Sequence, residues 1–249
     1  MKKDTVTLTY LGTSAFEITT VRGTRILIDP YISQNPLCQR KIEDFYDIDL
    51  LLVTHGAFDH FGDTMEIMKK SKASLVCGPD IARYALKIGI PKERVILTIY
   101  GDEREISGIR IKTVEAKHAS RLAGETETYY GVPLGFIITV ENDIRIYHAG
   151  DTSLFSDLRL FGMLYRPNIM LVGVANVSKG LPIEMNPREA AFAALWVAPD
   201  VVIPMHYPPG SKEPSKFLEA VKIIAPNVKP VLLKPNAQIT YHKYKLDVA

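Results

Sequence analysis

Histidine and aspartate side chains recur just after the apolar runs of this sequence. His55 directly follows the run LLLVT at 50–54, and Asp59 and His60 come a few residues later. His206 directly follows a second apolar run, VVIPM at 201–205. Imidazole nitrogens and carboxylate oxygens are the ligands that a borderline divalent ion such as zinc prefers. The pattern therefore indicates a metal site built at the ends of strands.

Two further residues stand in comparable places. His118 follows the extended segment 109–117, and Asp151 follows the segment 144–150. Because a carboxylate has two oxygens, Asp151 is able to bridge two ions. A single histidine at a strand end is usually structural, and the repeated placement is what favours a metal site. We interpret His148 as a structural strand residue and His242 as a surface residue of the C-terminal segment.

The elements that must position these residues are short strands and helices. Runs rich in β-branched residues predict strands at 6–12, 14–21 and 24–30. Apolar spacing and helix-start residues predict helices at 63–72, 80–88, 187–197 and 214–224. Asp63 or Thr64 is expected to cap the first helix, and Pro187 to lie in the first turn of the third. Asp59 and His60 would then lie in the turn before the first helix.

The sequence contains a weak internal echo. GTRILIDP at 23–30 resembles NDIRIYHAGD at 142–151, since each is a strand that runs into an aspartate. Each is followed by a continuous apolar run, at 50–54 and at 169–173, which is typical of strands buried on both faces. Two such halves predict a layered α/β sandwich with a site at the strand ends. A chance match is the alternative explanation of the echo.

Charge and hydropathy exclude several classes of protein. The 249-residue chain is 47% hydrophobic and 23% charged, as in an ordinary globular protein. Its net charge of +2 argues against nucleic acid or an anionic membrane as partner. No apolar run approaches the ~20 residues of a membrane span. The lysines near the start are not followed by the apolar core of a signal peptide.

No linker or low-complexity segment divides the chain, so we expect a single domain over residues 1–249. Cys38 and Cys77 lack the spacing of a metal site, and two cysteines are too few for a disulfide framework. These features fit a cytoplasmic protein.

Six motifs carry a resemblance to a known family. They are, in chain order, LGTSAFEI (11–18), LIDPY (27–31), THGAFDHFGD (54–63), KHAS (117–120), HAGDT (148–152) and PMHY (204–207). Together they resemble the metallo-β-lactamase superfamily of metal-dependent hydrolases, in particular the branch that contains L-ascorbate-6-phosphate lactonase. The resemblance implies a four-layer αββα sandwich of two similar halves, which agrees with the internal echo.

The resemblance also implies a set of metal ligands. In this family two ions are bound by histidines and aspartates and share one bridging aspartate. The matching residues here are His55 and His118 for the first ion, Asp59, His60 and His206 for the second, and Asp151 for the bridge. Asp59 is in addition the expected catalytic residue, which orients a water molecule or accepts its proton. Asp29 matches an aspartate that fixes the ligand loop without binding metal itself.

The chain departs from the family pattern near the first ion. Ala57 stands where the family has a ligand histidine, Phe58 follows it, and Thr13 stands where many members of the branch have a further histidine. His55, His118 and Asp151 would still give three ligands, the minimum for a catalytic zinc with an open position. We therefore expect a depleted first site and a more complete second site. Two explanations of Ala57 are open. One is natural divergence of the whole region, which Thr13 and Phe58 favour, and the other is an engineered change at this position.

The cofactor implied is a divalent metal, one or two ions per chain. A ligand set of histidine and aspartate without cysteine suits zinc first, with manganese, iron or nickel as alternatives. Such an ion would supply hydroxide to an ester, lactone or phosphodiester bond of a small, anionic substrate. Arg121, Asn176 and Lys179 are the candidates for binding that substrate. Residues 124–131 are expected to form a loop over the cleft, with Tyr129 and Tyr130 as its walls.

Several other functions compete with this hypothesis. A nuclease of the same fold is disfavoured by the charge balance, and a β-lactamase or a thioester hydrolase by the closer match to the lactonase branch. The alternative from another class is a degenerate, non-catalytic member that binds a ligand or partner, which the departures at Ala57 and Thr13 motivate. A homo-oligomer is expected because many relatives assemble.

Overall fold

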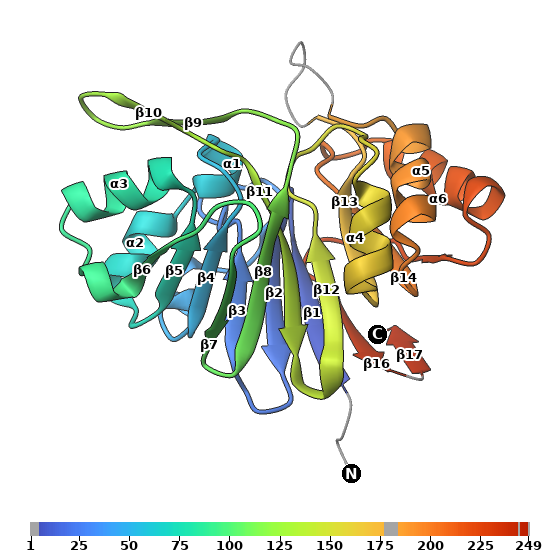
Figure 1. The fold of residues 1–249 in the computed structure, drawn as a ribbon, viewed down its shortest axis with the longest axis horizontal. Coiled ribbons are helices and arrows are strands. Elements are labelled where there is room, and N and C mark those ends of the chain that lie inside the picture. The colour runs from blue at the N-terminus through green and yellow to red at the C-terminus, as the bar shows by residue number, and fades with distance from the viewer. Residues whose placement is uncertain (1–4, 177–183, 244, 249) are drawn as a thin grey trace.

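Two mixed β-sheets pack face to face in the computed structural model, which describes residues 5–176, 184–243 and 245–248 (Figure 1). The first sheet has the order β17 (Lys245–Val248), β16 (Gln238–His242), β1 (Thr5–Gly12), β2 (Ala15–Thr20), β3 (Arg25–Ile28), β4 (Leu50–Val53), β5 (Ser74–Cys77) and β6 (Val95–Leu97). The second has the order β15 (Lys229–Pro230), β14 (Val201–Met205), β13 (Ile169–Gly173), β12 (Ile144–His148), β11 (Leu134–Val140), β8 (Ile109–Glu115) and β7 (Glu103–Ile106). A separate hairpin is formed by β9 (Ser120–Ala123) and β10 (Thr128–Gly131).

Helices cover the outer faces of both sheets, which gives the four layers of the predicted αββα sandwich (Figure 1). The helices are α1 (Phe58–Phe61), α2 (Thr64–Lys70) and α3 (Pro79–Lys87) beside the first sheet, and α4 (Leu158–Tyr165), α5 (Pro187–Val197) and α6 (Glu213–Ile224) beside the second. Short 3-10 turns lie at Ile42–Phe45, Lys92–Arg94 and Glu141–Asp143. The fold class expected from the sequence is confirmed.

The two sheets share one pairing scheme. In the first, β1, β2 and β3 pair antiparallel, and β3 to β6 then continue parallel. In the second, β8, β11 and β12 pair antiparallel, and β12 to β15 continue parallel. The strands of the internal echo, β3 and β12, therefore occupy the same place in their sheets, where antiparallel pairing gives way to parallel pairing. Parallel strands all point their carboxyl ends to one edge, which is where polar residues can meet.

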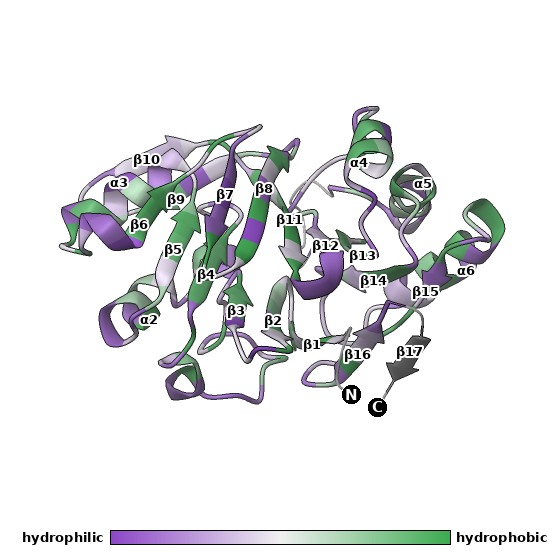
Figure 2. Cartoon of the chain, turned by 60° about the horizontal axis from the view of Figure 1, so that its bottom comes forward, coloured by the Kyte–Doolittle hydropathy of each residue, from purple (hydrophilic) through white to green (hydrophobic). Residues whose placement is uncertain are grey.

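Alternation along the strands explains why the apolar runs are continuous. Leu27, Leu51 and Leu75 lie side by side and face the helices α2 and α3. Their neighbours Ile28 and Leu52 point the other way, into the core between the sheets. Both faces of these strands are buried at 26–28, 50–53 and 75–77, and every one of these positions is apolar. In Figure 2 the strands β4 and β5 are mainly hydrophobic, whereas α3 carries hydrophilic residues on its outer side.

All four predicted helices form, with limits close to those expected. Pro187 begins α5, and the side chain of Asn186 accepts hydrogen bonds from the backbone N–H groups of Arg188 and Glu189. Asp63 stands at the start of α2 but does not cap it. Its carboxylate instead accepts hydrogen bonds from the backbone N–H groups of Ile32 and Ser33, both at 2.8 Å.

Two helices were not expected from the sequence. Asp59 and His60 lie in α1, so the expectation of a turn there is wrong. The helix α4 contains Gly162, which weakens the helical signal of its segment. A Cβ at this position would lie 2.6 Å from the backbone oxygens of Trp196 and Val197 in α5. Close packing of the two helices therefore requires the glycine. Within the described part of the chain, no helix has the length and apolar character to cross a membrane.

Candidate metal centre

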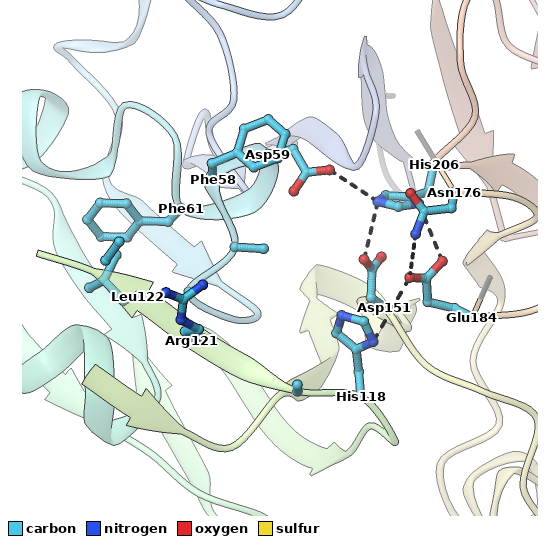
Figure 3. A pocket seen from close by; sticks show the side chains of 14 residues that line it. Phe58, Asp59, Phe61, His118, Arg121, Leu122, Asp151, Asn176, Glu184 and His206 are labelled. Carbon is cyan, nitrogen blue, oxygen red and sulfur yellow. Dashed lines mark hydrogen bonds and ion pairs between the residues drawn. The ribbon is translucent and has the colours of Figure 1, made fainter. Parts of the chain in front are cut away.

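Four of the predicted ligands, Asp59, His118, Asp151 and His206, line one cavity of about 610 Å³ at the carboxyl ends of the parallel strands (Figure 3), and His55 and His60 lie close to them. His55 follows β4, His206 follows β14, and the short helix α1 carries Asp59 and His60. His118 lies between β8 and β9, and Asp151 lies just beyond β12. Both halves of the molecule therefore contribute to one site.

The side chains form two groups with metal-like spacing. His55, His118 and Asp151 form one group, and Asp59, His60 and His206 form the other, with the potential ligand atoms of each group within 4.8 Å of one another. The distances around the second group are short. Asp151 Oδ2 lies 3.2 Å from both His60 Nε2 and His206 Nε2, and His206 Nε2 lies 3.4 Å from Asp59 Oδ2. In the first group, Asp151 Oδ2 lies 3.9 Å from His55 Nε2. Asp151 thus adjoins both groups.

Three of the four histidines are held through Nδ1. His55 Nδ1 lies 3.1 Å from Thr54 Oγ1, and His60 Nδ1 lies 2.7 Å from Asp29 Oδ2. His206 Nδ1 lies 2.9 Å from the backbone oxygen of Ala175. A proton on Nδ1 that is donated to these oxygens leaves the lone pair on Nε2. In all three rings Nε2 is the atom directed into the site.

Asp29 is the buried hub of these contacts. Its carboxylate accepts hydrogen bonds from the N–H and the hydroxyl of Thr54, both at 2.8 Å, besides its contact with His60. The residue is fully buried and has φ of 48°, an uncommon backbone conformation for a residue other than glycine. Asp29 itself stays outside both groups, while its bonds fix the loop that carries His55 and the ring of His60.

Several buried polar atoms at the site have no hydrogen-bond partner among the residues that the structure describes. They are His55 Nε2, His60 Nε2, His206 Nε2, Asp151 Oδ1 and Glu184 Oε2. Buried polar groups without partners cost free energy, and their concentration at one point calls for a further group that binds them all. Nitrogen and carboxylate oxygen donors at this spacing fit a divalent ion.

Burial and neighbouring charges act in opposite directions on the pKa values of Asp151 and His206. Burial disfavours the charge of Asp151, but His206 and His60 outweigh it and hold the pKa of Asp151 well below its usual range. Burial likewise disfavours charge on His206, but Asp151 and Asp59 raise its pKa to about 9. Burial and the neighbouring His60 lower the pKa of His55 to about 3. A divalent ion would compete with the protons that balance these carboxylates.

Sequence reasoning missed one acidic residue, Glu184. It lies just before α5 and is 8% exposed, and it forms a third compact group with Asp151 and His206. Burial and the negative charge of Asp151 raise the pKa of Glu184 to about 7. Asn176 donates to Glu184 Oε1 at 3.2 Å. No spacing in the sequence marks Glu184, because it follows no predicted strand and stands next to no other predicted ligand.

The residues predicted to bind substrate have different outcomes. Arg121 and Asn176 line the cavity, whereas Lys179 lies outside the described residues. Apolar side chains, Phe58, Phe61 and Leu122, form much of the remaining wall.

The expectation for residues 124–131 is wrong in two respects. The segment belongs to the β9–β10 hairpin, and its tyrosines do not line the described cavity. Tyr129 is buried against Tyr84 of α3, with ring centroids 5.5 Å apart, and Tyr130 is 74% exposed. Strand alternation places these neighbours on opposite faces of the hairpin, so they cannot form one wall.

The residues that depart from the family pattern lie at the cavity or beside a ligand loop. Ala57 and Phe58 line the cavity, so no imidazole approaches from position 57. Thr13 has φ of 54°, and its backbone oxygen accepts a hydrogen bond from the N–H of His206 at 2.8 Å. Thr13 thereby supports the loop of His206 through its backbone rather than its side chain.

The remaining histidines lie apart from the two groups. His148 is fully buried, with Nε2 at 2.9 Å from the backbone oxygen of Ser14, as a structural residue should be. His242 is the last residue of β16 and is half-buried.

Comparison with known proteins gives a consistent set of relatives. Residues 24–207 match the family model described as the beta-lactamase superfamily domain. A metal-dependent hydrolase of Methanobrevibacter smithii is 38% identical over 238 residues, which cover 94% of this chain and 96% of that protein. A metal-dependent hydrolase of Methanopyrus kandleri is 39% identical over 232 residues, 92% of this chain and 96% of the relative. The solved structure of a metallo hydrolase from Ignicoccus hospitalis superposes with a TM-score of 0.81 at 32% identity, covering 96% of this chain and 99% of that one.

Proposed function

The chain belongs to the β-lactamase superfamily of metal-dependent hydrolases, and we propose that it cleaves an ester, lactone or phosphodiester bond of a small, anionic substrate. The residues that we propose as ligands are His55, His118 and Asp151 for one ion and Asp59, His60, Asp151 and His206 for the other. A divalent ion in such a site lowers the pKa of water and polarises the bond to be cleaved. Zinc is the metal that we expect first.

The buried ligand atoms without partners are the observation that carries this proposal. Three imidazole Nε2 atoms and one oxygen of Asp151 meet without hydrogen bonds to any residue that the structure describes. A purely structural cluster would be expected to pair these atoms with one another or with backbone groups. Their common direction supports a metal centre in place of a hydrogen-bonded core.

The two ions are not expected to bind equally. Four side chains surround the second position, two of them carboxylates, whereas three surround the first. Ala57 supplies no donor atom to the first position. We therefore propose a tightly held second ion and a more weakly held first ion.

Asp59 is the residue to which we assign proton handling. It lines the cavity, and its Oδ2 is 3.4 Å from His206 Nε2. Burial raises its pKa, but His206 and His60 outweigh burial, so the pKa of Asp59 is lowered and the carboxylate is ionised at neutral pH. An ionised carboxylate at the cavity wall is able to orient a water molecule and accept its proton.

The cavity wall supports a small substrate with one anionic group. Arg121 is the one arginine or lysine among the described lining residues, and its guanidinium suits a carboxylate or phosphate. Phe58 and Leu122 beside it would contact the apolar part of the same molecule. A cavity of about 610 Å³ is of the size that small-molecule sites have.

Metal analysis and hydrolysis measured on the same samples would test the proposal. Protein purified without chelators should contain one or two divalent ions per chain, and Asp151→Ala should lose them. The wild type should hydrolyse generic nitrophenyl esters, lactones or bis(nitrophenyl) phosphate in a zinc- or manganese-dependent way. If the protein binds neither metal after incubation and hydrolyses none of these substrates, the proposal is wrong and a non-catalytic binding protein takes its place.

A further inference from the structure

One ligand histidine lacks the anchor that the other three have. His55, His60 and His206 each direct Nδ1 to an oxygen within 3.1 Å, from Thr54, Asp29 and Ala175 respectively. Among the described residues, no oxygen comes equally close to a ring nitrogen of His118, and its side chain is 29% exposed, against 0–2% for the others. An exposed ring without an anchor samples more orientations, which weakens any ion that it binds.

Glu184 lies where such an anchor is needed. Its Oε1 is 4.0 Å from His118 Nδ1, and its Oε2 is 3.8 Å from His206 Nδ1 (Figure 3). The carboxylate therefore faces the Nδ1 side of one histidine from each ligand group. Asn176 donates to Oε1 at 3.2 Å and fixes the orientation of the carboxylate.

The burial of Glu184 points to a role at the centre. The side chain is only 4% exposed, and Oε2 has no hydrogen-bond partner within the described part of the chain. A buried carboxylate is costly unless positive charge or donors compensate it. The described ion-pair partners of Glu184 are the two histidines, and a divalent ion bound to them would supply the compensating positive charge.

We propose that Glu184 is a positioning residue of the metal centre, which accepts the Nδ1 proton of His118 and directs its Nε2 at the ion. This inference rests on the proposed function, because it requires that His118 binds metal. A closure of about 1 Å between Oε1 and Nδ1 would complete the hydrogen bond. All four histidines would then have the same arrangement, with Nδ1 on an oxygen acceptor and Nε2 on the metal.

The position also has a consequence for the depleted first site. That site has lost the imidazole expected at position 57, so His118 provides a larger share of its binding. A carboxylate on Nδ1 makes the imidazole a stronger ligand and holds its tautomer. Glu184 thereby compensates for part of what Ala57 removes.

Metal affinity in three variants tests the inference. Glu184→Ala removes the acceptor, Glu184→Gln keeps an oxygen that can accept the Nδ1 proton, and Glu219→Ala changes an exposed glutamate of α6 as the matched control. Titration with Zn²⁺ and Co²⁺ should show about 10–100-fold weaker binding of one ion in Glu184→Ala. Glu184→Gln and Glu219→Ala should stay within about threefold of the wild type, and the Co²⁺ absorption spectrum should change only in Glu184→Ala.

The unfolding midpoint of the metal-free proteins separates positioning from a structural role. Without metal, Glu184→Ala should be as stable as the wild type or more stable, because it removes a poorly compensated buried charge. Unchanged metal affinity, or a loss of metal-free stability that accounts for the weaker binding, would overturn the inference. A wild-type protein that binds no ion would instead overturn the proposed function, which is a distinguishable result.

Discussion

Asp29 and Asp151 follow equivalent strands in the two halves of the molecule, yet they have opposite surroundings. β3 and β12 are both the strand at which antiparallel pairing changes to parallel. Asp29 has both oxygens occupied by Thr54 and His60 and is fully buried. Asp151 has one oxygen beside two histidines and the other without a hydrogen bond.

The difference comes from the neighbouring strand. In the first half, β4 is followed by Thr54, whose hydroxyl and N–H bind the carboxylate of Asp29. In the second half, β13 is followed by Val174, a buried residue without a side-chain donor. The end of a strand thus places a carboxylate at the edge of the sheet. The donors beside it determine whether both of its oxygens form hydrogen bonds or whether one of them can bind a metal ion.

Replacing each aspartate in turn should give the largest contrast. Asp151→Ala should abolish hydrolysis and remove both ions, because Asp151 adjoins both ligand groups. The loss of metal affinity should exceed the about 10–100-fold typical of a residue outside the ligand set. Elemental analysis and calorimetric titration would measure it. Retention of two ions by Asp151→Ala would show that Asp151 is not a metal ligand and does not differ from Asp29 in this respect.

Asp29→Asn should have the next largest effect. An amide keeps only one acceptor oxygen, so its NH2 group would face either the N–H of Thr54 or the hydroxyl of Thr54 and Nδ1 of His60. We expect metal binding about 10–100-fold weaker and a free energy of unfolding lower by about 1–3 kcal/mol. Urea unfolding and zinc titration of one preparation would measure both. Metal loss as complete as in Asp151→Ala would indicate that Asp29 is a ligand rather than an orienting residue.

Ala57→His should strengthen the weaker of the two sites. The new imidazole enters the cavity wall and adds a nitrogen donor beside His118 and Asp151. We expect the first ion to bind at least about tenfold more tightly, a change of about 1.4 kcal/mol. Stoichiometry measured at limiting zinc should rise toward two ions per chain. Ala57→Ser, which adds a polar atom of little zinc affinity, is the control and should leave the stoichiometry unchanged.

Thr54→Val should have the smallest effect. It removes the hydroxyl that donates to Asp29 Oδ2 and lies 3.1 Å from His55 Nδ1, but keeps the backbone N–H that binds Oδ1. The hydrogen bond to Asp29 contributes about 0.5–1.5 kcal/mol, so the free energy of unfolding should fall by about that amount. Metal affinity should fall less than in Asp29→Asn, because the N–H of Thr54 still binds Asp29 and Asp29 still binds His60. An effect larger than that of Asp29→Asn would show that the contact of Thr54 with His55 matters more than its bond to Asp29.

Much of this architecture follows from patterns within single segments. The apolar run at 50–54 predicts a strand buried on both faces, and Pro187 predicts the first turn of α5, as the structure has them. Predictions failed where a distant segment decides the outcome. Gly162 is required by the backbone of α5, and Asp63 binds the loop at Ser33 instead of its own helix.

The sequence by itself determined the types of the candidate ligands and the strand ends that carry them, because strand periodicity and residue chemistry are local properties. It also determined that position 57 has no side-chain atom that can bind a metal ion. Only the tertiary structure decided which donors and acceptors form hydrogen bonds with one another and which polar atoms stay without a partner. It placed the carboxylate of Glu184 near Nδ1 of His118. It also packed Tyr129 against Tyr84, away from the cavity. Hydrogen bonds and metal sites depend on distances between residues far apart in the chain, and no local pattern fixes those distances.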